Sequence, residues 1–117
     1  MLKMTLKSAL AVAVIICSAS LFAAEVTVSA AASLTNAFKD IAENFAAAHP
    51  EHTVLLNFAG SGELLQQIAK GAPVDVFASA DQETMDRAQK EGLVNAVDRK
   101  DFARNKLVLI VPADAKI

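Results

Sequence analysis

Cysteine is almost absent from this sequence, whose single thiol is Cys17, close to the N-terminus. One cysteine cannot form an internal disulfide, which excludes the class of small exported domains that depend on a disulfide framework. A lipid-modified cysteine needs a small residue immediately before it, and Ile16 occupies that position. The sequence therefore predicts neither a disulfide nor a lipid anchor.

An apolar run long enough to cross a membrane is also missing at the N-terminus. The apolar run there, residues 9–16, is much shorter than the roughly 20 residues that a spanning helix needs. The basic residues Lys3 and Lys7 precede this run, and small residues follow it. This is the order of a secretory signal, so we expect the chain to be exported.

The expected cleavage site follows Ala23. Cleavage one residue later would place the bulky Phe22 at the third position upstream, where a small residue is preferred. The sequence thus predicts a signal peptide over residues 1–23 and an exported chain over residues 24–117. That exported chain has no repeats, low-complexity tracts or long linkers, so we expect one domain with a small core.

An excess of positive charge is lacking as well. The whole chain has 11 basic and 13 acidic residues and a net charge of −2. Loss of Lys3 and Lys7 with the signal peptide would leave nine basic residues against thirteen acidic ones, a net charge of −4. An acidic domain has no electrostatic attraction for nucleic acid or for an anionic membrane, so neither partner is expected.

Short strand-like and helix-like segments alternate along the rest of the chain. Helical periodicity begins at Leu34 and ends before Pro50, a second helix ends at Gly71, and a third runs from its N-cap Asp81 to Gly92. Strands are predicted over residues 25–31, 53–58, 74–80 and 106–112. This order predicts the α/β class, with a parallel sheet covered by helices on both faces and joined by right-handed crossovers.

Two serines, Ser33 and Ser61, stand where a strand ends and a helix begins. The first N–H groups of a helix have no intrahelical acceptor, and the helix dipole adds partial positive charge there. Alanines precede Ser33, so an anion can approach the backbone, and we expect Gly60 and Gly62 to adopt positive φ and gather N–H groups around Ser61. Because the carboxyl ends of parallel strands share one edge, the two turns predict an anion site.

Neither serine turn contains lysine, arginine or a carboxylate. Neutral hydroxyl and amide donors can satisfy a fully ionised oxyanion, whereas a protonated anion such as phosphate also needs an acceptor for its proton. A fully ionised, acceptor-only oxyanion therefore fits these turns better, unless another part of the chain supplies an acceptor.

Each of these residues also has a purely structural interpretation. Ser33 alone is explained by N-capping, and Ser61 alone by a tight turn; the pairing at equivalent turns favours a site. His49 and His52 have a spacing that can bind metal, but beside Pro50 we interpret them as exposed surface residues, so no direct metal ligand is predicted. The carboxylates of residues 81–86 are interpreted as capping and solvated charge.

Four segments resemble the periplasmic molybdate-binding proteins of bacterial ABC importers. They are "AAASLTNAF", "FAGSGELLQQI", "GAPVDVFASAD" and "NKLVLIVP", in the order that this family shows, and the resemblance extends from Glu25 to about Pro112. It implies the first lobe of a type II periplasmic binding protein, a family whose two α/β lobes close on molybdate or tungstate. In that family the two matching serines donate hydroxyl and backbone N–H bonds to the oxyanion, which implies that Ser33 and Ser61 do so here.

The resemblance also implies the cellular role and what this chain lacks. It predicts a monomeric solute-binding protein of the periplasm that delivers the oxyanion to a membrane permease, with no cofactor and no catalytic activity. Molybdenum would be held only through its oxygens. Chains of this family are about twice as long, so we interpret this sequence as an N-terminal fragment whose second lobe is absent.

Two other functions remain open at this point. A binding lobe for sulfate, phosphate or a small organic anion is the nearest alternative. A hydrolase with Ser61 as nucleophile is less favoured, because Ala59 replaces the first glycine of the G-x-S-x-G elbow and the only two histidines lie together in a distant loop.

Overall fold

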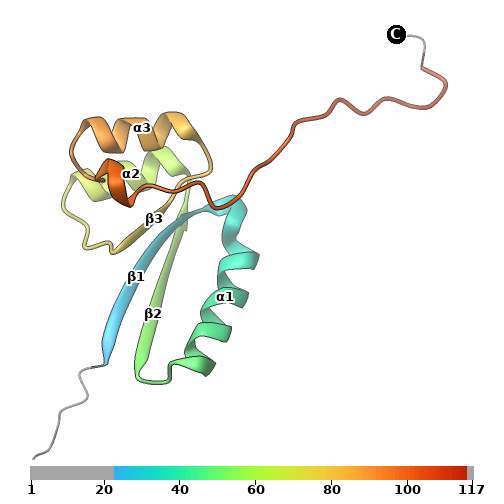
Figure 1. The fold of residues 1–117 in the computed structure, drawn as a ribbon. Helices are drawn as coiled ribbons and strands as arrows, with labels where there is room; N and C mark the ends of the chain where they lie inside the picture. The colour runs from blue at the N-terminus through green and yellow to red at the C-terminus, as the bar shows by residue number, and fades with distance from the viewer. Residues whose placement is uncertain (1–22, 116–117) are drawn as a thin grey trace, which may run out of the picture.

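The computed structural model describes residues 23–115, so the predicted signal peptide lies almost entirely outside the described residues. Three strands form one parallel sheet in the order β2-β1-β3 (Figure 1). The strands are β1 (Ala24–Ala31), β2 (His52–Ala59) and β3 (Val76–Ala78), and the helices are α1 (Thr35–Ala48), α2 (Ser61–Ala69) and α3 (Gln82–Lys90). The α/β class and the parallel sheet predicted from the sequence are confirmed.

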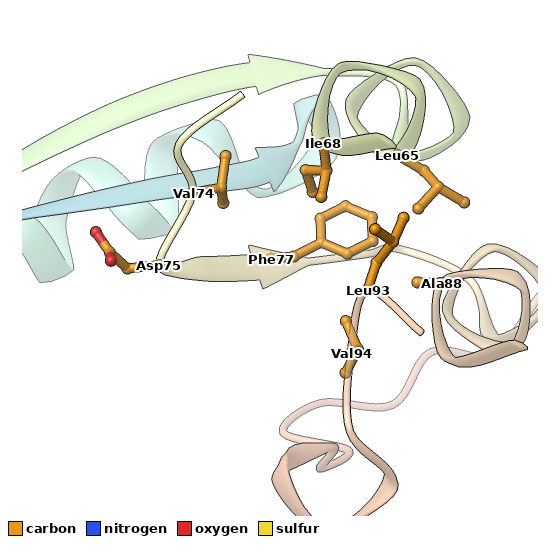
Figure 2. Close-up of a pocket in the computed structure, with 8 residues that line it drawn as sticks. All are labelled: Leu65, Ile68, Val74, Asp75, Phe77, Ala88, Leu93 and Val94. Carbon is orange, nitrogen blue, oxygen red and sulfur yellow. The ribbon is translucent and has the colours of Figure 1, made fainter. Parts of the chain in front are cut away.

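The helices cover both faces of the sheet. Because neighbouring residues of a strand point to opposite faces, Val76 and Phe77 of β3 contribute to different layers. Val76 faces the α1 side, where it lines an apolar cavity of about 170 Å³ with α1 and the valines of β1. Phe77 faces α2 and α3, as Figure 2 shows. The predicted two-sided covering of the sheet is therefore confirmed.

The core is small and is centred on β1. Val28 and Ala30 of β1 are buried with Ala78 of β3, and apolar side chains of α1 and β2 pack against them. On the other face, Leu64 and Leu65 of α2 are almost completely buried. The cavity in Figure 2, about 80 Å³, lies around Phe77 in this second layer and is lined mainly by apolar side chains, so we interpret it as a packing gap.

The ends of α2 and α3 are set by local signals that the sequence shows. Asp81 caps α3 by accepting a hydrogen bond from the backbone N–H of Thr84 at 2.7 Å. Gly71 and Gly92, with φ of 95° and 73°, end α2 and α3 in the left-handed conformation that favours glycine. The predicted cap and both glycine stops are confirmed.

The strand predicted over residues 106–112 is wrong. These residues form no regular secondary structure, and Leu107 is 98% exposed. A strand gains its hydrogen bonds from a neighbour, and no described segment lies beside this one to pair with it. Residues 106–112 have the apolar, β-branched composition that predicted a strand, but within residues 23–115 they have no strand to pair with.

The segment before this apolar run is attached both to α3 and to α1. Arg99 donates a hydrogen bond to Asp86 of α3 at 2.6 Å, and the ring of Phe102 lies edge-on to Phe38 of α1 with 6.0 Å between centroids. Residues 99–102 therefore connect α3 to α1, after which the chain leaves the lobe (Figure 1). Among residues 23–115, no helix is long and apolar enough to cross a membrane.

Candidate functional site

The carboxyl ends of the three strands bring three turns to one edge of the sheet. The turn after β1 contains Ser33, the turn after β2 leads directly into Ser61, and the turn after β3 contains residues 79–81. The order β2-β1-β3 places the reversal of strand order between β1 and β3, which is where open α/β sheets bind ligands. The structure thus assembles both predicted serines at the expected edge.

Ser33 is exposed in a short 3-10 turn, Ala32–Leu34, between β1 and α1. Its hydroxyl caps neither the 3-10 turn nor α1, so the N-cap interpretation of this residue is wrong. The polar contact in this turn is made by Thr35, whose hydroxyl donates to the carbonyl of Ala32 at 2.7 Å. An exposed hydroxyl without a capping role is available to a ligand.

Ser61 is nearly buried, with 9% of its surface exposed, and is the first residue of α2. Its hydroxyl oxygen accepts a hydrogen bond from the backbone N–H of Ala80 at 2.9 Å. This contact joins the turn after β2 to the turn after β3. The tight-turn interpretation of Ser61 is therefore wrong, since the residue begins a helix and is held by a second element.

The glycines on either side of Ser61 do not adopt the positive φ that we predicted. Gly60 has φ −63°, and Gly62 lies within the first turn of α2, where φ is also negative. The reason is that the helix begins at Ser61 itself, so no left-handed residue is needed. A Cβ at either glycine would meet no atom within 4 Å, so the fold leaves this surface open.

The turn after β3 is the part of this edge that the sequence analysis missed. The hydroxyl of Ser79 donates to the carbonyl of Asp81 at 2.9 Å and accepts from the N–H of Asp81 at 3.3 Å, which closes the turn on itself. Ala80, between them, presents its N–H to Ser61. The available signal was another Ala–Ser step, Ala78–Ser79, which stands at the end of the third strand and matches the step at Ser33.

Asp81 places a carboxylate close to Ser61. The backbone N–H of Thr84 is the main cause that lowers the pKa of this carboxyl group; the hydroxyls of Thr84, Ser61 and Ser79 lower it further, and partial burial opposes them. Asp81 is therefore ionised at neutral pH. The acceptor that the sequence analysis found in neither serine turn comes from the third turn.

The opposite edge of the sheet contains both histidines. His49 and His52 each lie near the Glu51 carboxylate, at 3.6 and 3.4 Å, and the ring of Phe45 packs on His49 with centroids 4.6 Å apart. His49 is half exposed and His52 is one-third exposed. Hydrogen bonds of the Glu51 backbone are the main cause that lowers the pKa of its carboxyl, with smaller contributions from the two histidines.

The two edges of the sheet are separated by the length of β2, because His52 begins this strand and Ser61 follows its end. Eight residues of strand span roughly 26 Å, so neither histidine can serve Ser61 as a general base. Within residues 23–115, no group of three or more histidine, cysteine or acidic side chains is arranged to hold a metal ion.

Comparison with known proteins shows the family. The bacterial extracellular solute-binding proteins match residues 26–117 of this chain. The chain belongs to this family. As a member of the solute-binding proteins, it is grouped with proteins that bind ligands and not with an enzyme family.

Two curated solute-binding relatives are molybdate-binding proteins ModA. The protein from Haemophilus influenzae is 38% identical over 94 residues, which cover 80% of this chain and 37% of the relative. The protein from Mycobacterium bovis is 46% identical over 91 residues, which cover 78% of this chain and 34% of the relative. The chain therefore spans about a third of the length of these relatives.

A solved structure of the same kind supports the fold. The substrate-binding domain of a putative molybdenum ABC transporter from Clostridium difficile is 39% identical, with a TM-score of 0.57. The similarity covers 59% of this chain and 30% of that domain. The three-stranded lobe described here thus corresponds to part of a larger solute-binding domain.

Proposed function

We propose that this chain is the first lobe of a solute-binding protein that captures molybdate or tungstate for an ABC importer. Residues 1–23 act as the signal peptide, residues 24–117 form the lobe, and the protein works in the periplasm as a monomer that delivers its ligand to a membrane permease. The names of the related proteins support the oxyanion and the transporter. No cofactor and no catalytic step are part of this proposal.

The observation that best supports an oxyanion ligand is the position of the two serines. Ser33 and Ser61 follow adjacent parallel strands, β1 and β2, whose register pairs Ala31 with Ala59 at the carboxyl edge. Each serine lies where a helical segment begins, so hydroxyl and backbone N–H donors point to the same edge. The oxyanion is held through its oxygens by Ser33 and Ser61, and the protein contributes no direct ligand to the metal.

One lobe provides only part of the binding energy. In this proposal the additional length of the relatives contains a second lobe, which closes over the anion, excludes water and adds donors. Without it the anion at Ser33 and Ser61 stays in contact with solvent, which weakens each hydrogen bond. A single lobe should therefore bind the anion more weakly than two closed lobes together.

The direct test is calorimetric titration of the chain, produced whole and purified from the periplasm of a bacterial host. Molybdate, tungstate, sulfate and phosphate are titrated separately into the wild-type protein and into Ser33→Ala and Ser61→Ala. Heat with molybdate or tungstate that both substitutions reduce supports the proposal. Equal heat from all four anions, or heat that neither serine affects, contradicts it.

A second anion class has a specific observation in its favour. The Asp81 carboxylate, whose pKa the Ser61 hydroxyl helps to lower after the dominant Thr84 N–H, can accept a hydrogen bond, and hydrogen phosphate has an O–H to donate. Stronger heat with phosphate than with molybdate in the same titration would establish this alternative. A serine hydrolase has no such support, because both histidines of the chain lie at the far edge of the sheet.

A further inference from the structure

The hydroxyl of Ser61 is held by a contact that no helix start requires. A serine hydroxyl has one proton to donate and two lone pairs that can accept. The N–H of Ala80 occupies one lone pair at 2.9 Å, across 19 residues of sequence. The oxygen of Ser61 is therefore fixed in place, while its proton can still rotate between neighbouring acceptors.

The turn that supplies this N–H is itself closed by Ser79. Two hydrogen bonds between the Ser79 hydroxyl and the backbone of Asp81, at 2.9 and 3.3 Å, leave the turn little freedom. The Asp81 side chain is directed toward α3 by its bond with Thr84. These contacts hold the Ala80 N–H against Ser61 and fix Asp81 as the next residue of the same turn. The Ser61 hydroxyl is also among the groups that lower the pKa of the Asp81 carboxyl, after the dominant Thr84 N–H.

A bound oxyanion and Asp81 would compete for the same proton. The lowered pKa of Asp81, which has the Ser61 hydroxyl among its causes after the dominant Thr84 N–H, agrees with a proton directed toward the carboxylate in the unliganded protein. A fully ionised oxyanion can accept the Ser61 hydrogen bond only if the hydroxyl turns away from Asp81. The negative charge of the carboxylate also repels the anion.

Resting on the proposed oxyanion function, we propose that the turn Ser79–Asp81 is the third element of the site and controls the Ser61 hydroxyl. The Ala80 N–H holds the hydroxyl oxygen, Ser79 keeps the turn in shape, and the Asp81 carboxylate limits affinity by competing for the proton. Ser79 and Asp81 are thus positioning residues that act on the ligand through Ser61.

This arrangement predicts that two substitutions in one turn change affinity in opposite directions. Ser79→Ala loosens the turn and should weaken molybdate binding roughly two- to tenfold, the effect of one neutral hydrogen bond. Asp81→Asn keeps the helix cap, because asparagine caps as well as aspartate, but removes the charge and the competing acceptor. It should strengthen molybdate binding roughly two- to fivefold, as expected for one exposed charge.

Nuclear magnetic resonance titration of the whole ¹⁵N-labelled chain is suited to weak binding and observes the Ala80 amide directly. Molybdate and hydrogen phosphate are titrated at pH 7.5 into the wild type, Ser61→Ala, Ser79→Ala, Ser79→Thr and Asp81→Asn. Glu83→Gln is the matched control, since it removes a charge from the same first turn of α3. Thermal unfolding of each variant shows that the protein is folded.

The expected result has four parts. The Ala80 amide resonance shifts in Ser61→Ala and in Ser79→Ala, and Ser79→Thr restores both that resonance and the wild-type affinity. Asp81→Asn binds molybdate more tightly than the wild type, with a smaller gain for hydrogen phosphate, whose O–H can donate a hydrogen bond to Asp81 in the wild type. Glu83→Gln leaves the affinity within twofold of the wild type.

Several results would overturn the inference. Asp81→Asn with unchanged or weaker molybdate binding contradicts the competition, as does an equal gain in Glu83→Gln. Ser79→Ala with wild-type affinity and an unmoved Ala80 amide contradicts the positioning role. If the wild type binds none of the oxyanions, the proposed function fails and this inference with it, whereas binding by the wild type with indistinguishable variants defeats the inference alone.

Discussion

Ser33 and Ser61 occupy equivalent places in two successive strand–helix units, yet one hydroxyl is exposed and the other is nearly buried and held by a neighbouring turn. A group that is already fixed loses little conformational freedom when a ligand binds, whereas a free one must be ordered at that moment. In the proposed site the two turns are therefore unequal: Ser61 is organised in advance, whereas Ser33 would be ordered only when the oxyanion binds.

The largest effect is expected from Ser61→Ala, because Ser61 is the serine whose hydroxyl the fold already holds in place. The substitution removes a donor to a charged acceptor, and such bonds contribute roughly 1.5 to 3 kcal/mol, or about ten- to a hundredfold in affinity. It also leaves the Ala80 N–H without its acceptor, so the free energy of unfolding should fall by about 1 kcal/mol. Molybdate titration and urea unfolding measure the two effects, and a variant that loses neither contradicts the role of Ser61.

Ser33→Ala should weaken binding less, by roughly three- to tenfold, because part of the interaction is offset by ordering the exposed turn. Its hydroxyl caps no helix, so the free energy of unfolding should stay within about 0.5 kcal/mol of the wild type. The same titration and unfolding experiments apply. A loss of affinity equal to that of Ser61→Ala would remove the distinction between the two turns.

Asp81→Ala examines the element that holds Ser61. Loss of the cap should lower the free energy of unfolding by about 1 kcal/mol at neutral pH. Because the pKa of Asp81 is lower in the folded chain than in the unfolded one, its ionised form stabilises the fold above the unfolded pKa. This contribution disappears as pH falls below about 4. Urea unfolding at several pH values should therefore show the variant and the wild type converging in acid, and a constant difference would contradict the assignment.

Gly62→Ala should give the smallest change in affinity, and it tests how closely the anion approaches the start of α2. Alanine favours the helix by about 0.5 kcal/mol or slightly more, and its Cβ meets no atom within 4 Å, so stability should rise. A glycine that the fold does not need is explained if the anion approaches α2 closely. A modest loss of affinity together with higher stability is the expected result of titration and thermal unfolding; unchanged affinity would show that the anion stays away from this face.

Much of the lobe could be predicted because its signals are local. The alternation of strand and helix, the Asp81 cap and the stops at Gly71 and Gly92 each depend on a few neighbouring residues, and all are present in the structure. The two serines could be placed at one edge because parallel strands end together. Whether they bind an anion stays a prediction.

The missed features depend on contacts between distant parts of the chain. The hydrogen bond from the Ala80 N–H to Ser61 joins residues 19 positions apart, and no local sequence pattern around either residue predicts it. Residues 106–112 have the composition of a strand, but a strand also needs a partner that composition cannot supply. The positive φ expected at Gly60 and Gly62 was wrong because α2 begins at Ser61 itself, so neither glycine needs the left-handed conformation.

The exposed run from Leu107 to Val111 has one more consequence, for the behaviour of the chain in solution. Five consecutive apolar residues with high β-propensity and no charge form the kind of segment that stacks into cross-β assemblies. Lys106 stands immediately before the run and Pro112 immediately after it. A charge and a proline in these positions are typical gatekeepers, which limit the length of any intermolecular ladder that this segment can enter.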